Sequence, residues 1–177
     1  MTRIGVLGIG NVLIGDDAVG PSVVNLLDAL WEFPEGVVVD DLGTPSLDLA
    51  ARLSDFDTVL FVDAVSSKAA PGSIRVYSRD EILKNPPGLR LSPHDPSLKE
   101  TLLTVDFLGT GPKEICLIGV VPESTTGLGM SEAVKDAIPH AAQAVLTELE
   151  RLDVVPKPRK TPKTTKPFWT TAAPTAH

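Results

Sequence analysis

Several features that would point to a function class are missing from this chain of 177 residues. It has a single cysteine, Cys116, so an internal disulfide framework is excluded. No apolar run approaches the roughly 20 residues that a transmembrane helix needs. No basic region followed by an apolar stretch and a small-residue cleavage site marks a signal peptide. We therefore expect a cytoplasmic protein with no membrane association.

Aromatic residues make up only 5% of the chain, whereas hydrophobic residues together make up 42%. The core must therefore consist mainly of Val, Leu, Ile and Ala, and the length favours one domain. The H-E-x-x-H motif of zinc peptidases and the G-x-S-x-G motif of serine hydrolases are both missing. Cys116 lies inside an expected buried strand at 114–121, which argues against a role as nucleophile.

Positive charge is unevenly distributed along the chain. The segment 156–177 holds five of the 16 basic residues and none of the 23 acidic ones, so residues 1–155 carry a net charge of −12. Such an acidic body argues against nucleic acid as a partner. The segment is rich in Pro, Thr and Lys and has no apolar periodicity, a composition that predicts disorder. We expect one domain at 1–155 and a disordered basic tail at 156–177.

Strand-like and helix-like segments alternate along this domain. Strands are expected at 3–8, 36–42, 57–65, 73–79 and 114–121, and helices at 18–31, 47–54, 96–108 and 131–152. The run at 57–65 is almost continuously apolar, which is typical of a parallel strand buried on both faces. The strand at 73–79 follows it after a short link, so it should be antiparallel and near an edge. The prolines at 86, 87 and 93 predict a loop over 80–95. The pattern predicts a three-layer α/β/α sandwich whose mostly parallel twisted sheet has about five strands, one of them antiparallel.

The stretch 8-GIGNVLIGDDAVG-20 follows the first strand, where glycines often bind a phosphate. Leu13, however, stands where the third glycine of the dinucleotide-binding motif should be. Asp16 and Asp17 come directly after Gly15, and their charges would repel a pyrophosphate by several kcal/mol, against about 1 gained from a helix dipole. We therefore expect no organic cofactor, and a cation rather than an anion at this loop.

Further acidic side chains follow the other expected parallel strands. Asp17 comes after the first strand, Asp41 ends the second and Asp63 ends the third, while His94 lies in a later loop. Because the carboxyl ends of parallel strands meet at one edge of a sheet, these residues can gather there. Carboxylates and an imidazole suit Zn, Ni, Mn or Fe. Taken singly, each has a simpler explanation: Asp16 or Asp17 can cap the following helix, and a loop histidine is often merely exposed.

Five short motifs occur in order along the chain, namely GIGNVLIGDDAVG at 8–20, DLGT at 41–44, VDAV at 62–65, SPH at 92–94 and IGVVPES at 118–124. Together they make the chain resemble the hydrogenase maturation endopeptidases, which trim the C-terminal extension from the large subunit of nickel–iron hydrogenases. The resemblance covers about residues 3–152 and leaves the tail outside.

The resemblance implies a set of site residues. Members of the family bind nickel that is already inserted into their substrate through three side chains, which correspond here to Asp17, Asp63 and His94. The first of these is glutamate in some members, so Asp17 reaches one methylene less far. Asp41 corresponds to an aspartate associated with cleavage, either as a structural residue or as a general base. Asp16 is assigned to the helix start rather than to the metal.

The expected partner is therefore a nickel–iron hydrogenase large-subunit precursor that brings its own nickel, and the expected enzyme is a monomeric endopeptidase. Its family is grouped both with aspartic and with metal-dependent peptidases, and the residues leave that choice open. One alternative is a non-hydrolytic nickel-binding or chaperone-like module that uses the same three ligands. Another is a small-molecule hydrolase, which would need a closed pocket where a protein substrate needs an open groove.

Overall fold

A mostly parallel sheet forms the centre of the computed structural model, which describes residues 2–45, 48–89 and 97–164. Its main strands are β1 (Ile4–Gly8), β3 (Val37–Asp41), β4 (Thr58–Ser66), β5 (Ile74–Ser78) and β7 (Glu114–Val120). They lie in the order β3-β1-β4-β7-β5; β5 alone among them is antiparallel, and it lies at the edge beside β7. The short β6 (Gly88–Leu89) adds an antiparallel pairing to β4. The predicted sheet is thus confirmed.

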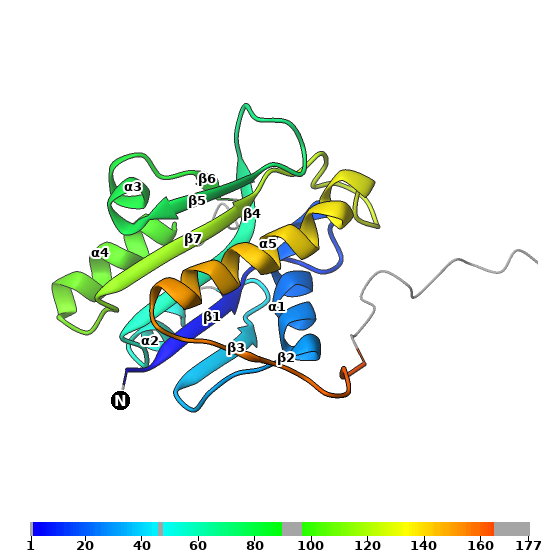
Figure 1. Ribbon diagram of the computed structural model, residues 1–177. Coiled ribbons are helices and arrows are strands. Elements are labelled where there is room, and N and C mark those ends of the chain that lie inside the picture. Colours follow the sequence, from blue (N-terminus) through cyan, green and yellow to red (C-terminus); the bar gives the residue numbers. More distant parts are fainter. Residues whose placement is uncertain (1, 46–47, 90–96, 165–177) are drawn as a thin grey trace, which may run out of the picture.

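Helices cover both faces of this sheet. They are η1 (Gly15–Ala18, a 3-10 helix), α1 (Val19–Leu30), α2 (Leu49–Leu53), α3 (Arg79–Lys84), α4 (Leu98–Leu108) and α5 (Glu132–Arg151). One face is covered by α1 and α5 and the other by α2, α3 and α4, which gives the predicted three layers (Figure 1). In the part of the chain that the structure describes, no helix is both long and apolar enough to cross a bilayer.

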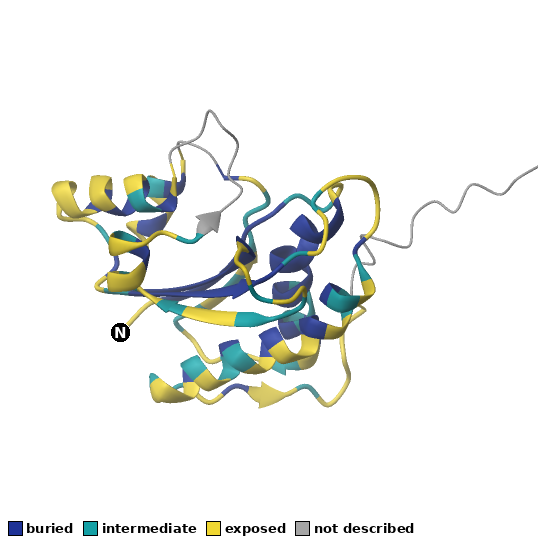
Figure 2. Ribbon diagram, turned by 90° about the horizontal axis from the view of Figure 1, so that it is seen from above, coloured by how far each residue is buried: buried dark blue, intermediate teal, exposed yellow. Residues whose placement is uncertain are grey.

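The central strand β4 shows why its sequence is continuously apolar. Leu60 and Val62 pack into the cluster beneath α1 and α5, whereas Val59 and Phe61 pack into the cluster beneath α2, α3 and α4. Successive side chains of a strand point to opposite faces, so a strand between two helical layers needs apolar residues at every position. All four are fully buried, and the buried strands lie between the two helical layers in Figure 2.

Helix α3 was not predicted: it begins at Arg79, the last residue of the expected strand at 73–79, and otherwise occupies the start of the expected loop at 80–95. It begins with a capping box, in which Glu81 N donates to Ser78 Oγ (3.4 Å) and Ser78 N donates to Glu81 Oε2 (2.8 Å). The S-x-x-E pattern at 78–81 is visible in the sequence and could have indicated this helix start. The prolines that follow it at 86 and 87 favoured the loop prediction instead.

The structure differs from the expectation of disorder at residues 156–164, which we call the strap. Its β8 (Lys157–Pro158) pairs with β2 (Trp31–Glu32) in an antiparallel two-stranded sheet. Beyond β8, the backbone N–H groups of Arg159 and Lys163 donate to the carbonyls of Leu30 and Ala29, at 2.8 and 2.9 Å. The strap follows α5 and crosses to the end of α1 (Figure 1). The rest of the expected tail, 165–177, lies outside the described residues.

The physical reason for this docking is the C-terminal end of α1. The last carbonyls of a helix have no partner within it and favour nearby cations, yet the last turn of α1 has no basic residue and contains Asp28. The strap supplies the missing basic side chains. Arg159 Nε donates to the Asp28 carbonyl (2.9 Å), and Lys163 Nζ donates to both Asp28 carboxylate oxygens (2.9 and 3.0 Å). Composition could not reveal this, because the two partners are about 130 residues apart.

Candidate active site at the carboxyl edge of the sheet

The two strands that follow β1 along the chain lie on opposite sides of it in the sheet. Strand β3, which follows β1, lies on one side of it, and β4, which follows β3, lies on the other side. Such a switch point opens a crevice at the carboxyl ends of the strands, where ligands bind in open α/β sheets. The turn after β1 is anchored here on both sides, because Ile9 N donates to Val62 O (2.9 Å) and Gly10 N donates to Gly43 O (2.8 Å).

Two glycines permit this close approach. A Cβ atom on Gly20, in the first turn of α1, would lie 2.1 Å from the Ile9 carbonyl oxygen and 2.4 Å from the Val62 carbonyl oxygen. Gly10 has φ +143°, and a Cβ atom there would lie 1.8 Å from the Asp17 carbonyl oxygen. Any side chain at either position would push η1 and α1 away from the ends of β1 and β4.

Asp17 and Asp63 are brought together at this switch point. Asp17 lies in η1 and is 7% exposed, and Asp63 lies near the end of β4 and is 3% exposed. The pKa of Asp63 is raised well above its ordinary value, first by burial and then by the negative charge of Asp17, while a hydrogen bond from Ala64 N (2.7 Å) lowers it. Two buried carboxylates that repel each other favour a cation or a proton between them.

Three backbone N–H groups of the turn after β1 are already bonded within that turn or to η1. Asn11 N donates to Asp17 Oδ2 (2.8 Å), Leu13 N donates to Asn11 Oδ1 (2.9 Å), and Ile14 N donates to Asn11 O (3.1 Å). A phosphate-binding loop instead points its free N–H groups at the ligand. With most of its donors engaged and the Asp17 carboxylate turned inward, this loop resembles a phosphate-binding loop little, and the expected cation stays a prediction.

Asp41 lies at the end of β3, where it is paired in register with Gly8 of β1. Its Oδ1 accepts a hydrogen bond from Gly43 N (2.8 Å), so the side chain closes the turn that follows its own strand. Among the described residues no hydrogen bond is made to its Oδ2. Asp41 is half-buried on the same edge as Asp17 and Asp63, and its role in cleavage stays a prediction.

His94, the third predicted nickel ligand, lies outside the described residues. Within the described ranges, no group of three or more His, Cys, Asp or Glu side chains is arranged to hold a metal ion. The structure therefore brings together two of the three predicted ligands, Asp17 and Asp63, and the complete set stays a prediction.

Asp16 has a different role from the one expected at the helix start. No side chain caps η1 or α1, and no acidic residue lies in the first turn of α1. The Asp16 carboxylate is fully buried and instead accepts hydrogen bonds from the loop at 122–131, which follows β7. No local pattern predicts these contacts, because the partners are more than 100 residues away in the sequence. Adjacent residues in a tight turn direct their side chains differently, so Asp16 and Asp17 serve different partners.

Two hollows lie at opposite edges of the sheet. A cavity of about 470 Å³ adjoins the site and is lined by residues of the loop at 122–131 and by Asp16. Exposed apolar side chains stand on the loops at this edge, with Leu13 67% and Leu128 88% exposed. A second cavity of about 630 Å³ lies at the amino edge, between β5, β7 and the end of α5. The carboxyl edge is thus a surface with exposed apolar side chains, which suits a protein substrate.

Cys116 borders the cavity at the amino edge. On β7 it pairs with Leu60 of β4, whereas Asp63 pairs with Gly119, three residues further along β7. Cys116 is 5% exposed, and burial raises the pKa of its thiol to about 12, with the nearby Glu148 carboxylate adding to the shift. The thiolate needed for nucleophilic attack is therefore strongly disfavoured at neutral pH, in agreement with the argument from the sequence.

Comparison with known proteins assigns a family to this arrangement. A family model described as hydrogenase maturation protease matches residues 21–148. The chain is 34% identical over 163 residues to the hydrogenase 2 maturation protease of Escherichia coli K12, covering 89% of this chain and 97% of that protein. It is also 34% identical over 152 residues to the hydrogenase expression/formation protein HoxM of Azotobacter vinelandii, covering 85% of this chain and 73% of that protein.

Solved structures lead to the same family. The hydrogenase maturating endopeptidase HybD from Escherichia coli superposes with a TM-score of 0.79 at 34% identity, covering 89% of this chain and 98% of that chain. The NiFe hydrogenase maturation protease HycI from Thermococcus kodakarensis KOD1 superposes with a TM-score of 0.68 at 29% identity, covering 84% and 93%. Each match covers more than four-fifths of this chain.

Proposed function

The chain belongs to the hydrogenase maturation protease family, and we propose that it cuts the C-terminal extension from the large-subunit precursor of a nickel–iron hydrogenase after nickel has been inserted. The observation that carries this proposal is the pair of buried carboxylates, Asp17 and Asp63, side by side at the switch point. A buried pair of like charges is costly for a fold and is therefore typical of a site that receives a cation.

In this proposal the nickel of the precursor is part of the substrate and docks onto Asp17, Asp63 and His94. The scissile peptide bond would then lie beside Asp41 and a water molecule. The water oxygen adds to the carbonyl carbon, Asp41 accepts its proton, and the carbon–nitrogen bond breaks as the leaving amine takes up a proton. Cleavage yields a new C-terminal carboxylate on the large subunit and a free peptide.

The proposal makes nickel a checkpoint for processing. A precursor without nickel presents no cation to the two carboxylates and would bind weakly, so only a loaded active-site subunit would lose its extension. The exposed apolar side chains of Leu13 and Leu128 favour a protein substrate over a small molecule at this edge.

The test is an intact-mass measurement on the cognate large-subunit precursor, prepared with and without nickel, after addition of this protein. We expect loss of a C-terminal peptide from the nickel-loaded form alone. Cleavage of both forms would keep the protease and reject the nickel checkpoint. Binding of the loaded precursor without cleavage of either form would overturn the proposal and favour a nickel-binding or chaperone-like module.

A further inference from the structure

Asp16 stands directly before a proposed nickel ligand, yet its side chain is turned away from that site and is 0% exposed. Its Oδ2 accepts hydrogen bonds from Glu123 N (2.8 Å), Ser124 N (2.9 Å) and Ser131 Oγ (2.9 Å). Its Oδ1 accepts from Ser131 N (2.6 Å). Both oxygens are thus bonded inside the protein, and the fully buried carboxylate is not presented to a metal.

These bonds hold the loop at 122–131 against η1. Two backbone bonds run between the same segments, from Gly15 N to Gly127 O and from Asp16 N to Ser124 O, both 3.0 Å long. The packing is tight, because a Cβ atom on Gly15 would lie 2.9 Å from the Ser124 carbonyl oxygen. The turn that contains Asp17 is thus fastened to a loop that is distant in the sequence.

The same carboxylate also reaches the start of α5. Ser131, the N-cap of α5, donates its Oγ–H to Asp16 and accepts a hydrogen bond from Val134 N (3.4 Å). A negative charge at a helix N-terminus is favoured by the helix dipole. One buried side chain therefore joins η1, the loop at 122–131 and the longest helix of the domain.

Asp63 and Asp17 are positioned in different ways. Asp63 lies on a central strand that is paired on both sides, whereas Asp17 lies on a turn of four residues that has no side-chain cap. The separation of the two carboxylates therefore depends on where this turn is held. Its attachment to the loop at 122–131 is made largely by Asp16.

We propose that Asp16 is a positioning residue, whose carboxylate holds η1 so that Asp17 and Asp63 present a site of the correct spacing to the nickel of the precursor. This inference rests on the proposed function. Asp16 itself touches neither the nickel nor the peptide.

The decisive variant is Asp16→Asn, which keeps the shape of the side chain. An amide nitrogen cannot accept a hydrogen bond, so in either orientation it faces at least one N–H donor. Ser131→Ala is a milder variant, because it removes the hydroxyl donor and leaves the Ser131 N–H in place. Asp106→Asn, on α4 at the amino edge, is the control for loss of a bonded carboxylate far from the site.

The measurement is the affinity of each folded variant for the precursor with and without nickel, together with its urea unfolding curve. We expect Asp16→Asn to weaken binding of the nickel-loaded precursor at least about tenfold and that of the nickel-free precursor less than about twofold, and Ser131→Ala to weaken the loaded form about threefold. Asp106→Asn should leave both affinities unchanged. A residue that only stabilises the fold would alter the unfolding curve and not this difference between the two forms.

Three outcomes would overturn the inference. If Asp16→Asn keeps the preference of the wild-type protein for nickel, Asp16 does not position the site. If it weakens both precursor forms equally, the loop at 122–131 is a general docking surface instead. If the wild-type protein itself binds both forms equally, the proposed nickel recognition fails first and the inference fails with it. Should Asp16→Asn not fold, Ser131→Ala decides, and an unchanged preference for nickel would count against the inference.

Discussion

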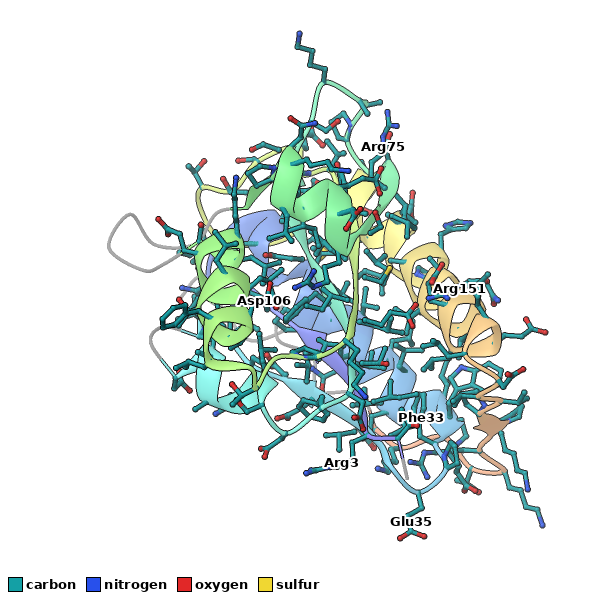
Figure 3. All side chains as sticks on the ribbon, turned by 90° about the vertical axis from the view of Figure 1, so that its left-hand side faces the viewer. Arg3, Phe33, Glu35, Arg75, Asp106 and Arg151 are labelled. Atoms are coloured by element: carbon teal, nitrogen blue, oxygen red, sulfur yellow. The ribbon has the colours of Figure 1, made fainter. Side chains whose placement is uncertain are left out.

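Three acidic side chains at the amino edge of the sheet and three at the carboxyl edge have different kinds of partner. At the amino edge, Asp106 pairs with Arg79, and Glu114 and Glu148 both pair with Arg151. Figure 3 looks at the molecule from the left-hand side of Figure 1 and labels Asp106 on α4 and Arg151 on α5. At the carboxyl edge, Asp16, Asp41 and Asp63 instead accept hydrogen bonds from backbone N–H groups, and no ion pair among the described residues involves these three.

This difference distinguishes acidic residues that stabilise the fold from acidic residues that we expect to have a functional role. The ion pairs of the amino edge are partly exposed and add modest stability. Asp63 is buried near a second negative charge, an arrangement that costs stability in the isolated chain. Such costs concentrate at functional sites, because a protein rarely keeps them elsewhere. The comparison therefore favours the carboxyl edge as the proposed site without reference to any motif.

The largest expected difference between the edges is in cleavage. Asp63→Asn should lower the rate of precursor processing at least about 100-fold, because the amide removes one of the two charges proposed to bind the nickel. Asp106→Asn, the matched change at the amino edge, should alter the rate less than about twofold. Single-turnover cleavage of the nickel-loaded precursor measures both. Similar rates for the two variants would contradict the assignment of the site.

The same variant should make the fold more stable. Because the pKa of Asp63 is raised in the folded state, folding favours the protonated acid, and the wild-type protein loses stability as pH rises from the unfolded pKa through the raised folded one. Asn does not titrate, so Asp63→Asn should exceed the wild-type stability by about 1–3 kcal/mol at neutral pH. The difference should vanish at low pH.

Urea unfolding of the wild-type protein and Asp63→Asn over a series of pH values measures this difference directly. Titrating groups that do not interact with Asp63 affect both proteins alike and largely cancel, whereas Asp17, which is coupled to Asp63, contributes to the difference. A difference that does not change with pH, or a variant less stable than the wild-type protein at neutral pH, would show that the buried charge is compensated within the protein.

A change of similar size in the free energy of unfolding, but with no change in cleavage activity, is expected for a substitution in the strap. Arg159→Ala removes the hydrogen bond to the Asp28 carbonyl and the ion pairs to Asp28 and Glu32, and should lower the free energy of unfolding by about 1–2 kcal/mol. Lys160→Ala is the matched control, because Lys160 is exposed on the same segment. Thermal unfolding compares the two variants; equal midpoints would mean that the contacts of Arg159 add nothing to stability.

The smallest effect is expected for the ion pair of Arg79 and Asp106. Both side chains are about one-third exposed, so Asp106→Asn should destabilise by about 0.5–1 kcal/mol. Because this interaction is electrostatic, the loss should shrink in high salt. Urea unfolding at low and high ionic strength checks both points, and a salt-independent loss would indicate packing rather than charge.

Much of the fold could be predicted because it follows local patterns. The apolar run at 57–65 predicted a strand buried on both faces, and β4 occupies Thr58–Ser66 between two helical layers. The alternation at 73–79 predicted an antiparallel strand near an edge, and β5 is that strand. Helix α3 was not predicted although the S-x-x-E pattern of its capping box is present at 78–81, because the nearby prolines favoured a loop.

The candidate site was predictable only in part. Parallel strands end at one edge, so the placement of Asp17, Asp41 and Asp63 there follows from topology, and the motifs led to the same family that the comparisons show. The closeness of Asp17 to Asp63 could not be deduced, because it depends on how η1 is held. His94 remains a prediction from the family motif.

The sequence by itself determined the features that depend on near neighbours. These are the periodicity of each element, the mostly parallel direction of strands that alternate with helices, and the family motifs. What only the tertiary structure decided is which distant groups bond to a given carboxylate. Asp16 is bonded to residues 107 to 115 positions away, and Asp28 to residues 131 to 135 positions away. No local pattern encodes such partners, because a carboxylate accepts any donor that the packed chain brings within about 3 Å.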